Sequence, residues 1–369
     1  MKLALKLPKK TNNIIFGNDS FEIVNIFKKN NITYKIYSEK FVTVYFNARF
    51  ILKYIKNFIK LFNSCHALQL IYNNYHLTVI QSMSPKFIYT QTDNSTLIHW
   101  LSKHEKNIRF ISIQNGLRTK HEFKYFKNKH LENYNHDIFF MFGEHEESMY
   151  NRMNININKP MKLGSLRLGM FLEKKYVCHK KYNICLVSEF MREPNKGSKH
   201  YEIEKELYDY ELKFHKILNQ YIVETNQKIL IALQSSKRDL QVEYFTNIFG
   251  DNALFHENTN IFSSYEAVCM SELTIGFFST LLIESLALGN KVLSVDTSNS
   301  DKYFDYPSCI KHDYHDYDAF KLYIDKIINM NNSDYNVLSK NISEYAMSIN
   351  HSRYPHNEIL KIATGGIKI

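Results

Sequence analysis

Apolar residues along this chain fall into two recurring patterns, short continuous runs and longer stretches with helical spacing. The short runs predict buried strands, and apolar positions three or four residues apart predict helices. In the first half, the predicted strands are 2–6, 13–16, 32–36, 77–80, 86–90, 109–114 and 136–143. The predicted helices are 20–29, 46–62, 95–104 and a stretch that begins near Glu144. Strands that alternate with helices favour βαβ units and a parallel sheet.

The same alternation begins again near residue 181. The strands predicted there are 181–190, 227–235, 253–257, 273–277 and 291–295. The helices predicted there are 203–224, 239–248, 260–270, 281–288, 317–330 and 333–349. A chain of 369 residues is long enough for two domains of ordinary size. We therefore expect an α/β protein with two Rossmann-like domains, 1–172 and 173–350, whose parallel sheets face a central cleft, and a segment 351–369 that packs back towards the first domain.

Composition indicates a globular protein with a basic surface. Hydrophobic residues make up 44% of the chain and charged residues 23%. The 47 lysines and arginines exceed the 37 acidic residues, which suits nucleic acid, anionic lipid or phosphorylated substrates. Five cysteines without a C-x-x-C pair indicate a reducing compartment. The N-terminal MKLALKLPKK lacks a signal-peptide pattern and no stretch approaches about 20 uncharged apolar residues, so we expect a cytoplasmic location.

The stretch IGFFSTLLIESLALGNKVLSVD (275–296) carries the most specific chemical signal. It reads as strand, short turn, helix and strand, with Gly289 in the position that ends a helix. Ser279 or Thr280 can cap this helix, and the free N–H groups at a helix N-terminus bind anions. Glu284, about one turn further on, can accept hydrogen bonds from a ribose diol. An ordinary capped helix with Glu284 in solvent explains the local pattern equally well.

This stretch resembles the nucleotide-sugar segment of GT-B glycosyltransferases, which often read S-x-x-x-E-(small)-x-x-x-G-x-P-V. Lys291 stands where many members have Pro, while the Gly is kept. The resemblance implies the GT-B fold, with an acceptor-binding first domain and a nucleotide-sugar-binding second domain. It also implies that Ser279 and Thr280 contact the donor phosphate and that Glu284 contacts the donor ribose.

A second motif, IQNGLRTKHEF, lies at the end of an apolar strand and contains several basic residues after the glycine. Gly116 permits a left-handed turn or a close backbone approach, although a plain polar loop also explains it. Gln114, Asn115, Gly116 and Arg118 resemble the QHG or QNG loop of bacterial surface-carbohydrate transferases, a superfamily that includes polyol-phosphate polymerases and acidic-sugar transferases. Where some members have His this chain has Asn115, and an amide cannot serve as a base near pH 7.

A third motif, FGEHEESMY followed by LGSLRLG, resembles the segment that closes the N-terminal domain in the same superfamily. The resemblance makes Glu144 a candidate base or acceptor ligand. It places Ser165 and Arg167 at the hinge, where the guanidinium can reach a phosphate. An acidic residue favoured by the dipole at a helix N-terminus is the simpler explanation for Glu144.

Strand ends supply weaker candidates. The sequence TDNS at 92–95 ends a strand and caps a helix, which makes Asp93 a minor candidate at the cleft. In the second domain, Ser188 ends the first strand, and Ser235 and Arg238 follow the next one, where they can meet the donor.

Two other patterns have competing explanations. The segment KHDYHDYDAF (311–320) contains histidines and a D-x-D that could hold a metal, but Asp316 or Asp318 fits a helix cap better. The helix RFILKYIKNFIKLF (49–62) suits contact with an anionic bilayer or an ordinary core-facing helix. Its expected apolar face is Ile51, Tyr54, Ile55, Phe58, Ile59 and Phe62. Its expected basic face is Arg49, Lys53, Lys56 and Lys60.

We therefore expect a glycosyltransferase that moves a hexosyl or acidic sugar from a nucleotide-activated donor to a lipopolysaccharide, capsule or lipid-linked acceptor. Glu144, or else Asp93, is the expected general base, and the helix at Ser279 with Arg167 or Arg238 would stabilise the departing phosphate. GT-B enzymes generally work without a bound metal, so no cofactor or essential metal is expected. The enzyme would act in the cytoplasm, with a contact at the inner membrane through 49–62 and no nucleic-acid partner.

Three alternatives remain open. A CDP-polyol phosphotransferase and a nucleotide-sugar epimerase would keep the same fold. A non-catalytic nucleic-acid-binding protein would explain the net charge and the many aromatic residues. The charge is spread along the chain and no nucleic-acid-binding motif is present, which disfavours this last reading.

Overall fold

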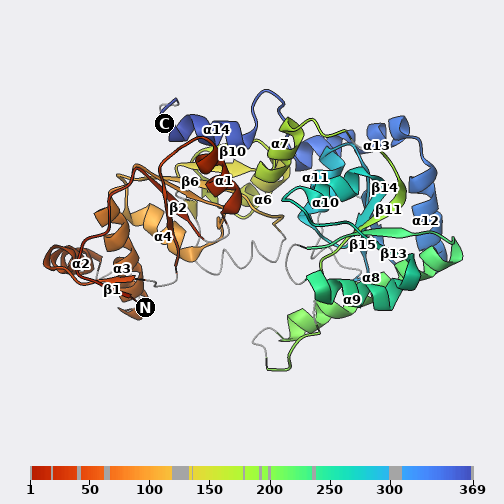
Figure 1. Ribbon diagram of the computed structural model, residues 1–369, viewed down its shortest axis with the longest axis horizontal. Coiled ribbons are helices and arrows are strands. Elements are labelled where there is room, and N and C mark those ends of the chain that lie inside the picture. The colour runs from red at the N-terminus through yellow and green to blue at the C-terminus, as the bar shows by residue number, and fades with distance from the viewer. Residues whose placement is uncertain are drawn as a thin grey trace. The chain divides into compact units, whose positions relative to one another are not determined.

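The computed structural model describes residues 2–17, 20–39, 43–61, 67–118, 133–134, 136–177, 179–190, 193–197, 201–234, 238–298 and 310–366. The chain divides into two compact units, each built around a parallel sheet (Figure 1). The first unit comprises Met1–Asn115, Phe123–Gly169 and Asn350–Ile369. The second unit comprises Gly116–Glu122 and Met170–Ile349. The C-terminal segment therefore belongs to the first unit, and a short segment around residue 118 belongs to the second.

A six-stranded parallel sheet forms the centre of the first unit. In sheet order its strands are β10 (Pro160–Lys162), β8 (Ile138–Met141), β6 (Arg109–Ile113), β5 (Phe87–Thr90), β2 (Asn13–Phe16) and β3 (Lys35–Tyr37). Its helices are α1 (Phe21–Lys29), α2 (Ala48–Leu61), α3 (Ala67–Met83), α4 (Thr96–His104), α6 (Glu144–Arg152) and α14 (Pro355–Ala363). Ranked along the chain, the strand order is 2-1-3-4-5-6, so the winding direction reverses between β2 and β5.

The first unit also contains two small parallel strand pairs and, at the C-terminal end of the chain, helix α14. The pairs are β1 (Lys2–Ala4) with β4 (Thr43–Tyr45), and β7 (Asn133–Tyr134) with β9 (Asn156–Ile157). Helix α14 packs against α1, at the other end of the sequence.

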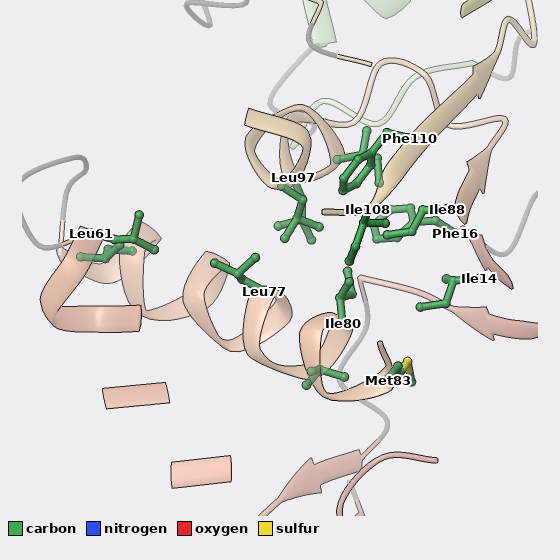
Figure 2. Close-up of a cluster of buried hydrophobic side chains, with 14 of the residues drawn as sticks. Ile14, Phe16, Leu61, Leu77, Ile80, Met83, Ile88, Leu97, Ile108 and Phe110 are labelled. Atoms are coloured by element: carbon green, nitrogen blue, oxygen red, sulfur yellow. The ribbon is translucent and has the colours of Figure 1, made fainter. Parts of the chain in front are cut away.

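The core of the first unit explains why its strands read as continuous apolar runs. Every residue of β2 and β8 is buried, because helices cover both faces of a parallel sheet. Figure 2 shows side chains from the strands meeting those of α3 and α4 in one cluster. The labelled members are Ile14, Phe16, Leu61, Leu77, Ile80, Met83, Ile88, Leu97, Ile108 and Phe110.

The strand predicted at 77–80 is wrong, because these residues lie inside helix α3. The β-branched run from Thr78 to Ile80 favours a strand locally. From residue 73 to residue 80, α3 is enclosed on most sides, so the apolar residues there show no clear helical stripe. Its buried polar groups bond locally or to α2: Thr78 Oγ1 donates to the Asn74 carbonyl at 2.8 Å, and Asn74 Nδ2 donates to the Tyr54 carbonyl at 3.0 Å. Tertiary burial overrides strand propensity at this point.

The second unit contains another six-stranded parallel sheet. In sheet order its strands are β13 (Ala253–Phe255), β12 (Ile229–Ala232), β11 (Tyr182–Val187), β14 (Ser271–Gly276), β15 (Lys291–Asp296) and β16 (Lys311–Asp313). Its helices are α8 (Tyr201–Glu224), α9 (Arg238–Phe249), η1 (Gly250–Asn252), α10 (Ser263–Cys269), α11 (Thr280–Ala287), α12 (Tyr317–Asn329) and α13 (Asn332–Ala346). Helix α7 (Leu166–Glu173) spans the change from the first unit to the second. The strand order is 3-2-1-4-5-6, with its reversal between β11 and β14.

Candidate functional site

The turn after β14 lies at the reversal point of the second sheet. Gly276 ends the strand, and a Cβ built there would lie 3.3 Å from Leu282, so α11 packs closely against β14. Ser279 caps α11 as expected, because its Oγ accepts the Leu281 N–H at 3.4 Å. Gly289 ends the helix with φ +83°, which also confirms the expectation. Ligands of doubly wound sheets bind outside the carboxyl ends of strands at such a reversal.

Glu189 follows β11, the strand that pairs with β14, and its side chain contacts the turn after β14. Its carboxyl forms a hydrogen bond with the Ser279 side chain. Burial raises the pKa of Glu189 above its usual value, and the bond from Ser279 opposes that rise. The Glu189 carbonyl accepts Gln234 Nε2 at 2.7 Å, which ties the end of β11 to the end of β12. These two bonds place the Glu189 carboxyl beside the start of α11.

A segment from the QNG motif reaches the start of α11. The Leu117 N–H donates to Thr280 Oγ1 at 3.0 Å, and both residues belong to the second unit. A Cβ on Gly116 would lie 3.6 Å from Thr280 Oγ1 and 3.9 Å from Arg118 Nη1. Arg118 is buried, and its Nη1 also donates to the Leu117 carbonyl at 3.3 Å. A guanidinium, a hydroxyl and a helix N-terminus therefore converge, which is a donor set suited to phosphate.

Glu284 is held in place one turn into α11. It is buried, and its Oε1 accepts the hydroxyl of buried Tyr265 at 2.8 Å. The Tyr265 ring stacks on Phe171, with ring centroids 5.1 Å apart and planes at 19°. This geometry excludes the alternative in which Glu284 lies on a solvated face. No local pattern around Glu284 indicates Tyr265, since Tyr265 lies 19 residues away on α10.

The other candidates in the second unit make bonds within the fold. Ser188 is buried, and its Oγ donates to Gln241 Oε1 at 3.0 Å. Arg238 is the first residue of α9, and its Nη1 donates to the His256 carbonyl at 3.2 Å. Ser235 lies outside the described residues. These bonds join α9 to the sheet.

The hinge candidates bond inside the first unit. Arg167 forms an ion pair with Glu22 on α1, using both Nε and Nη2. The Glu22 side chain is almost fully buried, so this guanidinium compensates a buried carboxyl. Ser165 is buried, and its Oγ accepts the Leu168 N–H at 3.4 Å near the start of α7.

Gln114 and Asn115, which follow β6, differ in burial: Gln114 is buried and Asn115 is exposed. Gln114 is buried, its N–H donates to the Phe140 carbonyl at 2.9 Å, and its Oε1 accepts the Phe142 N–H at 3.0 Å. These two bonds fasten the end of β6 to the end of β8. Asn115 is exposed and is the last residue of this part of the first unit.

The two candidate bases differ in access. Glu144 begins α6, its side chain is exposed, and its Oε2 lies 2.5 Å from Lys162 Nζ. Lys162 also contacts Glu147 at 2.8 Å, and these bonds raise the pKa of the lysine. Asp93 is fully buried, and its carbonyl bonds to His99 Nε2 at 2.9 Å. Only Glu144 is open to solvent.

The reversal point of the first sheet contains Gly17 and Ser20, which the sequence analysis did not single out. Gly17 follows β2 with φ +93°, and a Cβ there would lie only 2.6 Å from Thr92 Oγ1. Ser20 Oγ donates to the Phe16 carbonyl at 3.0 Å and accepts the Gln91 N–H at 3.3 Å. A glycine directly between an apolar strand and a helix was the available signal.

The D-x-D segment is a helix start. Asp316 caps α12, because its Oδ1 accepts the Ala319 N–H at 2.8 Å, as expected. The His312 ring stacks on Tyr323 with centroids 4.8 Å apart. Within the part of the chain that the structure describes, no group of three or more His, Cys, Asp and Glu residues could hold a metal ion.

Comparison with known proteins identifies the family. Residues 111–362 match a family described as "putative O-antigen biosynthesis protein". The chain belongs to this family. The match covers the QNG motif and the whole second sheet. No curated protein sequence matches the chain.

Solved structures identify the fold of this O-antigen biosynthesis family member. The UDP-GlcNAc 2-epimerase of Methanocaldococcus jannaschii, in complex with UDP-GlcNAc and UDP, is 14% identical, with a TM-score of 0.54 over 99% of this chain and 100% of that chain. The wall teichoic acid polymerase TagF is 11% identical, with a TM-score of 0.54 over 98% and 91%. Sucrose-phosphate synthase of Thermosynechococcus elongatus is 11% identical, with a TM-score of 0.50 over 96% and 99%. The expected GT-B fold is therefore confirmed.

Proposed function

We propose that this protein is a glycosyltransferase that moves a sugar from a nucleotide-activated donor to a growing cell-surface glycan or its lipid-linked precursor. The observation that carries the proposal is the convergence at the start of α11. There the Leu117 N–H bonds to Thr280, and Arg118 packs beside Gly116. Membership of the O-antigen biosynthesis family supports the glycan product. The enzyme would act in the cytoplasm, on activated sugars made there.

The donor diphosphate would bind at the N-terminus of α11. The Thr280 hydroxyl and the positive end of the α11 dipole would stabilise its oxygens. Arg118 would offset the negative charge that develops on the departing nucleotide phosphate as its bond to the sugar breaks. We assign this role to Arg118, because Arg167 is paired with Glu22 and Arg238 bonds to the His256 carbonyl. No metal is required in this scheme, since the cation is supplied by the chain.

Glu284 would fix the nucleoside. Its Oε1 already accepts the Tyr265 hydroxyl, which holds the carboxyl in one orientation. A carboxylate accepts hydrogen bonds from hydroxyl groups, which is the chemistry that recognises a ribose diol. For the acceptor, Glu144 is the proposed general base, because it is exposed at the start of α6 while Asp93 is fully buried.

The test is a thermal-shift panel of UDP-, GDP-, CMP-, CDP- and dTDP-linked compounds on wild type and variants. A ligand that binds only the folded state raises the melting temperature by mass action. Arg118→Ala and Glu284→Gln should each abolish the shift given by the cognate nucleotide family. Arg109→Ala is the matched control: Arg109 lies at the amino end of β6, the strand that precedes the QNG motif, and is paired with Asp137. A folded wild type that no nucleotide stabilises would contradict the proposal.

Two other reactions have support from structural neighbours. The epimerase neighbour binds UDP-GlcNAc and the TagF neighbour is a wall teichoic acid polymerase, so epimerisation and polyol-phosphate transfer are the alternatives. Incubation with UDP-GlcNAc alone, followed by NMR of the sugar, separates them. An epimerised nucleotide sugar formed without acceptor would replace the transferase proposal. Stabilisation by CDP-linked polyols alone would favour phosphate transfer.

A further inference from the structure

Helix α2 has apolar residues on two sides, and only one side faces the core. Phe50 and Leu61 are buried, while Tyr54 and Phe58 pack against the core cluster of the first unit. The expected single apolar face is therefore wrong in part. Ile59, which was expected on the same face as Tyr54 and Phe58, is 71% exposed.

The second apolar side of α2 continues onto α3. Leu52, Ile55 and Ile59 are exposed and follow helical spacing, so they line one stripe. Leu68 and Ile71 on α3 are also exposed, Leu68 at 84%. The Tyr54 hydroxyl donates to the Ile71 carbonyl at 3.4 Å, which brings this part of α3 beside α2. Figure 1 shows α2 next to α3 in the first unit.

Exposed large hydrophobic residues are concentrated in the N-terminal part of the first unit. Of the eighteen exposed large hydrophobic side chains in the described part of the chain, ten lie between Leu5 and Ile71. Apolar patches of this kind mark interaction surfaces. We define the α2–α3 face as Arg49, Leu52, Ile55, Lys56, Ile59, Lys60, Leu68 and Ile71.

The charge on the α2–α3 face has a single sign. Arg49, Lys56 and Lys60 are exposed beside the aliphatic stripe. The sequence contains no Asp or Glu at all from residue 41 to residue 92. The face therefore combines lysine and arginine with leucine and isoleucine, and it lacks the acidic groups that a basic partner would need.

We propose that the α2–α3 face docks on an anionic lipid bilayer, with α2 lying in the plane of the interface. An interfacial helix inserts its aliphatic stripe among the acyl chains while its basic residues bind anionic headgroups. A second copy of the chain fits less well, because pairing this face with itself would bring like charges together. None of the helices in the described residues has the length and apolar character needed to cross a bilayer. The docking is peripheral and holds the first unit against the lipid surface.

Vesicle co-sedimentation tests the proposal with the full-length protein. The vesicles are equimolar phosphatidylglycerol and phosphatidylcholine, or phosphatidylcholine alone, in about 0.1 M salt, where screening is moderate. Wild type should bind the anionic vesicles and release from them at high salt. Lys56→Glu with Lys60→Glu changes four charge units and should weaken binding roughly 100-fold or more, at about a fivefold effect per charge. Leu52→Gln with Ile59→Gln should also weaken binding.

Matched variants on the second unit control for total charge and hydrophobicity. Lys326→Glu with Lys340→Glu, and Leu322→Gln with Val337→Gln, change exposed residues of α12 and α13 and should leave binding unchanged. All variants should melt like wild type, because every substituted side chain is exposed.

Three results would overturn the proposal. The first is absence of wild-type binding to anionic vesicles, and the second is α2 variants that bind as wild type does. The third is a dimer, detected by light scattering, that the variant Leu52→Gln with Ile59→Gln abolishes, together with no binding to vesicles. This result would assign the α2–α3 face to a second copy of the chain. None of these measurements uses a nucleotide sugar, so their outcome is independent of the proposed activity.

Discussion

Replacing Tyr265 with Phe tests whether the Glu284 carboxyl depends on a single buried donor. The Tyr265 hydroxyl and Glu284 Oε1 are 2.8 Å apart and both residues are buried. The substitution keeps the stacking on Phe171 and removes only the hydroxyl. A buried acceptor that loses its donor costs about 2 kcal/mol of unfolding free energy. For a domain of this size, this corresponds to a fall in melting temperature of roughly 4–8 °C.

A double-mutant cycle isolates the contact from general packing. Tyr265→Phe, Glu284→Leu and the double variant are compared by urea unfolding followed by circular dichroism. In the Glu284→Leu background the hydroxyl has lost this acceptor, so Tyr265→Phe should cost almost nothing there. The coupling free energy should be about 1–3 kcal/mol. Equal costs of Tyr265→Phe in the two backgrounds would refute the claim that this bond positions Glu284.

Three further outcomes follow from single contacts. Gly17→Ala should cost about 2 kcal/mol or more in urea unfolding, because of the positive φ and the 2.6 Å approach to Thr92, whereas Gly250→Ala, with positive φ and open space, should cost about 1. Burial lowers the pKa of His99 to about 4, below its value in the unfolded chain. The stability that neutral His99 contributes is therefore present above about pH 6.5, and the free energy of unfolding falls by about 3 kcal/mol as the pH drops towards 4. His99→Phe should flatten this pH dependence of the unfolding free energy. Arg167→Ala should destabilise the protein by about 2 kcal/mol, because Glu22 loses its ion-pair partner. The nucleotide-induced thermal shift should be unchanged in this variant. Loss of that shift would indicate that Arg167 contacts the donor.

Features decided within a few residues could be predicted from the sequence. The cap at Ser279, the helix end at Gly289 and the cap at Asp316 all depend on neighbours within four positions. The alternation of strands and helices likewise predicted both parallel sheets. Local patterns failed where burial was set by distant elements. Helix α3 looked like a strand at 77–80 because it is enclosed on most sides, and α2 carries apolar residues on two sides.

Which residues come together at the site could not be predicted from local patterns, because it is decided by contacts between residues far apart in the sequence. Leu117 and Thr280 are 163 positions apart, and their bond brings Arg118 to α11. Arg167 and Glu22 are 145 positions apart, and their pairing gives this arginine a role inside the first unit. Both arginines follow a polar turn and look equivalent in the sequence. Only the fold distinguishes the one beside the α11 N-terminus from the one that compensates a buried carboxyl.

The two reversal points differ chemically, and this difference bears on the choice between a transferase and an epimerase. In the second sheet the turn at Ser279 is accompanied by a helix N-terminus and a guanidinium, which suit an anion. In the first sheet the groups around Gly17 are neutral: Thr92 Oγ1 lies closest, and Ser20 Oγ bonds to the Phe16 carbonyl and the Gln91 N–H. Neutral groups of this kind suit sugar hydroxyls better than phosphate. A transferase needs two substrates of these different chemistries, whereas an epimerase acts on one molecule, so the contrast favours the proposed transfer reaction.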